Sequence, residues 1–231
     1  MGAMNEFLLQ AAAIIIPLVI AIVFHEVAHG WVARMLGDPT AHEQRRLSFN
    51  PLRHVDPFGT IILPGILWLT TQTPFGWAKP VPVNQWRLRD PRRGMMAVAA
   101  AGPTMNLVLA AVGAILLGLW VRYAQGVESP WLQFIGETCS KFVLFNVFLA
   151  SFNLLPIPPF DGSHIVEGLL PRAAARQYER LRPFGFVLLI VLLLIVPRVF
   201  PGWGVIERIV LPPVNWILQY YEQLVDLIAL G

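Results

Sequence analysis

The sequence predicts an all-α polytopic membrane protein, a bundle of about four to six transmembrane helices with a re-entrant or extended segment after the first helix. Of its 231 residues, 56% are hydrophobic and 13% are charged, whereas soluble domains carry about 25% charged residues. Several apolar runs also approach the ~20 residues that a helix needs to cross a bilayer. We expect one integral-membrane domain over residues 1–231, with its core at 6–170 and C-terminal helices at 183–231.

The first helix is expected from Glu6 to Met35, with Gly37 as its stop. Its apolar run lacks a basic n-region and a small-residue cleavage site, so we interpret it as a retained helix and not a signal peptide. A bilayer helix tolerates the internal Pro17, because neighbouring groups satisfy the freed carbonyl.

The next apolar segment, Phe58 to Leu69, is too short to span comfortably and is broken by Pro64 and Gly65. We therefore expect it to be re-entrant or to dip into the membrane. The stretch from Trp77 to Asn84 contains prolines that forbid a helix and suit an extended edge.

The second half of the chain is predicted to be helical and rich in apolar residues. The tail has apolar residues at helical spacing and an acidic polar face, which predicts an interfacial or docked helix or a fifth crossing. Three prolines before Asp161 impose an extended link there. The expected helices are 93–123, 131–155, the short 163–170, 184–200 and the tail 214–230.

The Lys and Arg distribution orients the chain. Arg34 and the segments 38–57, 79–93 and 172–182 hold 13 of the 17 basic residues, and the link 124–130 holds none. By the positive-inside rule these basic segments lie on the cytoplasmic side, provided that the 58–77 segment does not cross.

Three titratable residues, His25, Glu26 and His29, lie inside the first apolar run. A spacing of four places the two imidazoles on one helical face, about one turn apart, where they can hold one metal ion. Glu26 is then close enough to act on a water that the metal activates. Ionisable groups are costly inside a membrane, so this cluster predicts a functional site and not simple packing of polar groups.

A catalytic zinc needs three protein ligands and one open position. The third ligand must come from elsewhere at the same depth, and Asp161 is ahead of His164 because a proline-broken helix end can turn its carboxylate into the bundle. The single Cys139 argues against a thiolate site. The full set of candidates for the third ligand is Asp161, His164, Glu167, His54 and Asp56.

Three motifs together resemble the site-2 protease family of intramembrane zinc metalloproteases. His25 to His29 is similar to the HExxH helix of the family, Gly102 to Asn106 to its GPxxN element, and Asn153 to Gly162 to its N-x-x-P-x-P-x-x-D-G element. The chain resembles a minimal form of the family without PDZ or CBS domains. It departs from many members in having Phe160 where they have Leu or Met.

The resemblance implies one zinc ion per chain, held by His25, His29 and Asp161, with Glu26 as the general base. It implies that Asn153 lies beside the substrate strand, and we include Asn106 and His54 as further candidates for substrate contact. The structural alternatives are an interhelical hydrogen bond for Asn106, a helix-end cap for Asn153, and a solvated loop for His54.

The implied function is an intramembrane zinc endopeptidase of a bacterial or archaeal cell membrane, with its active site nearer the cytoplasmic side. Its partners would be the lipid bilayer and transmembrane segments of membrane proteins, cleaved in regulated proteolysis or in clearance of signal-peptide remnants, and no nucleic acid. The alternatives are a metal transporter or sensor and an inactive protease-like scaffold. Polar groups that cluster at one depth argue against transport, and the intact Glu26 argues against the scaffold.

Overall fold

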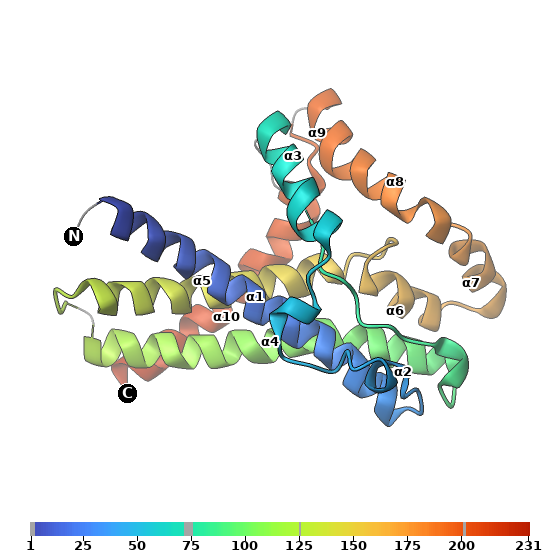
Figure 1. The fold of residues 1–231 in the computed structure, drawn as a ribbon, viewed down its shortest axis with the longest axis horizontal. Helices are drawn as coiled ribbons and strands as arrows, with labels where there is room; N and C mark the ends of the chain where they lie inside the picture. Colours follow the sequence, from blue (N-terminus) through green and yellow to red (C-terminus); the bar gives the residue numbers. More distant parts are fainter. Residues whose placement is uncertain (1–2, 72–75, 125, 201) are drawn as a thin grey trace.

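The computed structural model describes residues 3–71, 76–124, 126–200 and 202–231, and every regular element in them is helical (Figure 1). Within these residues, four segments are long and apolar enough to cross a membrane. The prediction of a polytopic helical membrane protein is confirmed. The four segments are Glu6–Met35, Pro91–Ala124, Pro130–Asn153 and Arg172–Val199.

Helix α4 (Pro91–Ala124) is central, because α1 (Ala3–Met35) and α5 (Pro130–Asn153) both pack along it (Figure 1). Small residues allow this close approach in lipid. A Cβ added at Gly113 would lie 2.8 Å from Phe142 Cδ1 of α5, and one added at Gly118 would lie 2.8 Å from Ile228 Cβ.

The C-terminal tail forms α10 (Leu211–Leu230), which packs against α4 and α5. The Tyr221 hydroxyl donates a hydrogen bond to the Leu107 carbonyl oxygen at 2.7 Å. Val214 is buried in the core between these helices. Of the sequence alternatives for the tail, the structure shows a helix docked on the bundle.

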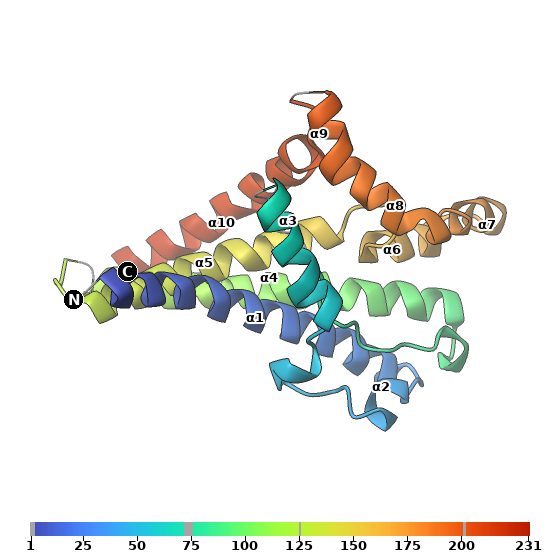
Figure 2. The same ribbon diagram turned by 45° about the horizontal axis from the view of Figure 1, so that its top comes forward.

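The chain between α1 and α4 forms only short α-helices in its described part. It contains α2 (Thr40–Glu43) and α3 (Leu63–Thr71), and Figures 1 and 2 show α3 standing across the direction of α1 and α4. The 58–77 segment of the re-entrant prediction falls partly outside the described residues, which omit 72–75. Short 3-10 or π-helical turns occur at Pro51–Arg53, Pro57–Ile62 and Gln85–Arg87.

The segment Trp77–Asn84 has no regular secondary structure, in agreement with its prolines, and it is fastened to the end of α1. The fully buried Asp38 carboxylate accepts the Asn84 backbone N–H at 2.6 Å. Gly30 leaves room for this segment, because an added Cβ there would lie 2.8 Å from Val81 Cγ1.

Helix boundaries differ from the sequence prediction by one to three residues, and two differences concern the chain after the proline-rich link. Helix α6 (Asp161–Leu169) begins at Asp161 and not at residue 163, since Phe160 already has the extended backbone of an N-cap residue. The basic stretch after Pro171, for which we predicted no helix, forms α7 (Arg172–Glu179). The elements that follow are a 3-10 turn at Arg182–Phe184, α8 (Gly185–Ile190), a π-helical turn at Val191–Ile195, α9 (Val196–Val199) and a π-helical turn at Ile206–Val210.

Candidate metal centre

Three metal-ligating side chains converge where α6 begins against α1. His25 Nε2 and His29 Nε2 lie 3.0 Å apart, and Asp161 Oδ2 lies 3.1 Å and 3.3 Å from them. Both histidines are buried. Among the residues that the structure describes, this is the one group of three or more His, Cys, Asp or Glu side chains whose ligand atoms gather within 4.8 Å.

The hydrogen bonds on the far side of each imidazole define its tautomer. His25 Nδ1 lies 2.6 Å from Asn106 Oδ1, and His29 Nδ1 lies 2.7 Å from the Val98 carbonyl oxygen. Both oxygens accept, so each Nδ1 carries the proton and each Nε2 presents a lone pair to its neighbour.

Three acceptor atoms therefore face one another in a buried space. The Asp161 Oδ2 atom is buried and has no hydrogen-bond partner in the described part of the chain. Unpaired acceptors at this distance repel one another and are costly to bury, unless a cation lies between them. Two neutral imidazoles and one carboxylate are the donor set of a catalytic zinc site, so the residues present fit that metal.

Gly102 of α4 makes room for the cluster. A Cβ added there would lie 2.5 Å from both His25 Cε1 and His29 Nε2. Gly162 acts similarly on the α6 side, where an added Cβ would collide with the Leu154 and Leu155 carbonyl oxygens. Gly102 thus lets α4 approach the histidine helix, and Gly162 lets α6 approach the chain that follows α5.

Glu26 lies beside this cluster, and its orientation comes from the extended segment. Its Oε2 accepts the Val81 backbone N–H at 2.8 Å. Glu26, His25, His29 and Asp161 all line one cavity of about 620 Å³. The apolar part of its wall includes Trp77, Phe152, Phe160 and Phe186.

The other predicted site residues separate into two groups. Asn153 lines the cavity, and its Nδ2 donates to the Leu149 carbonyl oxygen at 2.9 Å, as a helix-end amide does. Asn106 and His54 do not line it. Asn106 is fully buried behind His25, and the buried His54 donates from Nε2 to the Ser48 carbonyl oxygen at 2.7 Å. Neither residue is therefore placed to touch a substrate in this cavity: the Asn106 amide bonds other protein groups, and His54 Nε2 bonds the Ser48 carbonyl oxygen.

The remaining candidates for the third ligand are engaged elsewhere. Asp56 accepts the backbone N–H groups of Phe58 and Gly59 at 2.9 Å and 3.0 Å, and the Glu167 carboxylate pairs with Arg182. His164 reaches the cavity, but its Nδ1 lies 3.2 Å from an Arg182 nitrogen. Burial, and then the Arg182 guanidinium, lower the pKa of His164 below its ordinary value, so the imidazole is neutral at pH 7.

The sequence analysis missed Asn146 of α5. It is fully buried, its Oδ1 accepts from Asn106 Nδ2 at 2.8 Å, and its Nδ2 donates to the Phe142 carbonyl oxygen at 2.8 Å. Asn106 also donates to the Ala21 carbonyl oxygen at 3.1 Å. A lone amide inside an apolar membrane helix is the signal that could have identified Asn146.

This chain of amides yields a prediction for Asn106→Leu. The substitution leaves the His25 Nδ1–H without its acceptor, so we expect zinc affinity to fall by about 10–100-fold, as for other partners of ligating histidines. Competition with a fluorescent chelator measures this affinity. Asn153→Leu is the matched control, since its amide touches no histidine. An unchanged affinity in Asn106→Leu would contradict the positioning role.

Fold and site together define a class, the polytopic membrane proteins with a candidate metallopeptidase centre inside the helix bundle. The comparison with known families is more specific, because residues 13–141 and 132–196 match Peptidase family M50. The chain belongs to that family, which confirms the resemblance based on the three motifs.

Curated relatives agree with the family. YwhC of Bacillus subtilis (strain 168) is 37% identical over 179 residues, 78% of each chain. MJ0611 of Methanocaldococcus jannaschii is 32% identical over 145 residues, 63% of this chain and 64% of that one. Rip2 of Mycolicibacterium smegmatis is 29% identical over 173 residues, 74% of this chain and 62% of that one. All three carry the name zinc metalloprotease as a provisional assignment. No solved structure matches the chain.

Proposed function

We propose that this protein is an intramembrane zinc endopeptidase of the site-2 type, which hydrolyses peptide bonds in transmembrane segments of other proteins. The observation that carries the proposal is one cavity in which the Glu26 carboxylate lies beside the three facing acceptors of His25, His29 and Asp161. Membership of Peptidase family M50 and the names of its relatives support it. Nothing in the fold or the comparisons favours a metal transporter or an inactive scaffold.

In this proposal His25, His29 and Asp161 hold one zinc ion per chain. Zinc in such a site lowers the pKa of water at its open position to about 7 and polarises a carbonyl group. The amides of Asn106 and Asn146 keep His25 in the tautomer that binds metal.

Glu26 acts as the general base and then as the general acid. It takes a proton from the attacking water and passes it to the leaving amine nitrogen. The hydrogen bond from the Val81 N–H holds its carboxylate toward the cavity. The largely apolar wall strengthens these interactions, because charges interact more strongly beside apolar groups than in bulk water.

The extended segment is the proposed docking edge for substrate. Val83 lines the cavity, and its backbone N–H and C=O have no hydrogen-bond partner among the described residues. A substrate helix that unwinds locally can pair with such an edge as an added strand. Asn153, on the same cavity wall, is positioned to contact that strand.

The basic segments gather at one end of the bundle. Figure 1 shows α2, α7 and the start of α4 at this end, and both termini at the other. We assign the basic end to the cytoplasmic side of a bacterial or archaeal cell membrane by the positive-inside rule. The metal centre then lies nearer the cytoplasm.

Cleavage of a designed transmembrane peptide by the purified protein in detergent tests the proposal. We expect cleavage with zinc bound. Removal of the metal by phenanthroline should lower the cleavage rate by at least about 100-fold, since the metal supplies several kcal/mol of transition-state stabilisation. Adding zinc back should restore the rate. Mass spectrometry locates the cut. Cleavage that survives complete metal removal contradicts the proposal, as does metal uptake by proteoliposomes without any cleavage.

A further inference from the structure

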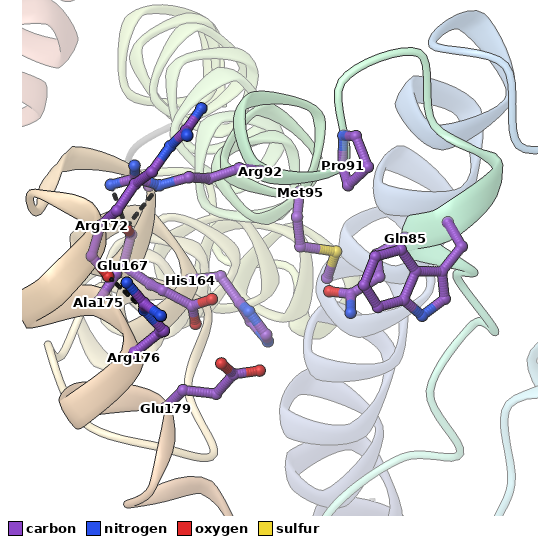
Figure 3. A pocket seen from close by; sticks show the side chains of 12 residues that line it. Gln85, Pro91, Arg92, Met95, His164, Glu167, Arg172, Ala175, Arg176 and Glu179 are labelled. Atoms are coloured by element: carbon purple, nitrogen blue, oxygen red, sulfur yellow. Dashed lines mark hydrogen bonds between the residues drawn. The ribbon is translucent and has the colours of Figure 1, made fainter.

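A second cavity, of about 490 Å³, lies at the basic end of the bundle (Figure 3). It is bounded by the start of α4, by α6 and α7, and by the 3-10 turn Gln85–Arg87. Its charged and polar lining consists of Gln85, Arg92, His164, Glu167, Arg172 and Arg176, with Glu179 at the end of α7.

The charge of this second cavity is not balanced within the protein. In the described residues neither Arg172 nor Arg176 has a carboxylate partner. The Arg92 guanidinium donates to the Glu167 carbonyl oxygen at 3.0 Å and 3.2 Å, which is not an ion pair. The carboxylates of Glu167 and Glu179 both face Arg182, which is outside the lining. The lining therefore carries three guanidinium groups and two carboxylates, and both carboxylates already pair with Arg182.

The second cavity adjoins the metal cavity, because Met95 and His164 line both. The Arg182 guanidinium is donor-only and lies 3.2 Å from His164 Nδ1, so Nδ1 accepts and Nε2 carries the proton. His164 Nε2–H has no partner among the described residues. The shared wall thus adds a neutral N–H donor to the guanidinium groups, a combination suited to carboxylates.

The proposed docking edge leads from one cavity to the other. Pro80, Val81 and Val83 line the metal cavity, and Gln85 and Trp86, which follow after Asn84, line the second cavity. Gln85 and Trp86 follow Val81 by four and five residues. Because paired strands advance together, a substrate strand along this edge would enter the second cavity roughly four to seven residues from the metal.

We propose that the second cavity binds acidic side chains of the substrate, on the flank that leaves the metal site toward the basic end of the bundle. The inference rests on the proposed function and names its substrate class: transmembrane segments with Asp or Glu roughly four to seven residues from the cleaved bond. Transmembrane segments usually carry Lys or Arg on their cytoplasmic flank, and the unpaired arginines repel these. Charge at this cavity therefore selects substrates.

Three designed peptides with one transmembrane segment and a flank of three Glu, three Gln or three Lys test the proposal. Their dissociation constants are measured by fluorescence anisotropy on zinc-loaded Glu26→Gln protein in neutral detergent, and kcat and KM on wild type. We expect the Glu flank to bind about tenfold more tightly than the Lys flank, with the difference in KM and not in kcat, because the contact is equal in ground and transition states.

In the variant R172Q/R176Q the peptides with Glu and Lys flanks should bind with about equal dissociation constants. The dissociation constant of the Gln-flanked peptide should stay as in wild type. This is the result expected when a contact that is equal in ground and transition states is lost. The matched control is R89Q/R180Q, which removes the same charge from exposed arginines at the same end that line neither cavity. It should retain the wild-type ratio.

The outcomes separate this inference from the proposed function. If wild type cleaves all three peptides without regard to flank, or if R172Q/R176Q keeps the ratio, the inference is wrong and the protease remains. If no peptide is cleaved, the proposed function is wrong. The dissociation constants from fluorescence anisotropy then still show whether the second cavity prefers the Glu flank. If the arginine variant instead changes activity only when anionic phospholipid is added, the cavity binds a lipid headgroup and the inference is overturned.

Discussion

Glu26→Gln is expected to lower kcat for cleavage of a transmembrane peptide by about 10²–10⁴-fold, the usual contribution of a positioned general base. The substitution keeps the size of the side chain and an oxygen that can accept the Val81 N–H. It removes only the ability to take a proton from water. Quenched-flow or gel assays with saturating peptide measure kcat directly.

The same variant should retain its affinity for zinc and for substrate, since Glu26 does not belong to the group of three facing ligands, His25, His29 and Asp161. Glu137→Gln is the matched control, because among the described residues Glu137 pairs only with Lys141, at 3.3 Å on a partly exposed stretch of α5. We expect its kcat to stay within about twofold of wild type, as for surface substitutions. A Glu26→Gln protein that cleaves at the wild-type rate would assign the base to another residue.

Asp161→Ala should reduce bound zinc from near one ion per chain to near zero. A site with two imidazoles and no carboxylate loses one of three protein ligands and the only ligand charge, and metal affinity depends on both. Elemental analysis of purified protein measures zinc per chain. His25→Ala should give the same result, because its Nε2 lies 3.1 Å from the Asp161 carboxylate.

His164→Ala is the control for this experiment. His164 lines the metal cavity, but Arg182 occupies its Nδ1, so we expect near one zinc per chain in this variant. Zinc retained in Asp161→Ala and lost in His164→Ala would reverse the assignment of the third ligand. A wild-type protein that binds another divalent metal and no zinc would overturn the choice of metal.

Local patterns were sufficient to predict the membrane helices and the first two candidate ligands. Hydropathy over about 20 residues reflects the thickness of a bilayer, and a spacing of four reflects the pitch of one helix, so neither needs knowledge of distant contacts. The extended segment 77–84 was predictable for the same reason, since proline restricts its own backbone. The placement of the amphipathic tail was ambiguous, because apolar residues at helical spacing do not indicate which surface the helix packs on.

The sequence by itself thus determined a membrane bundle with His25, Glu26 and His29 on one helix, and it narrowed the third ligand to five residues. Only the tertiary structure brought Asp161 to the histidines, moved Asn106 from the substrate side to the back of His25, and joined it to Asn146. The physical reason is separation along the chain. His25 and Asn106 are 81 residues apart, and their contact depends on how α1 packs on α4, where small residues such as Gly102 set the distance.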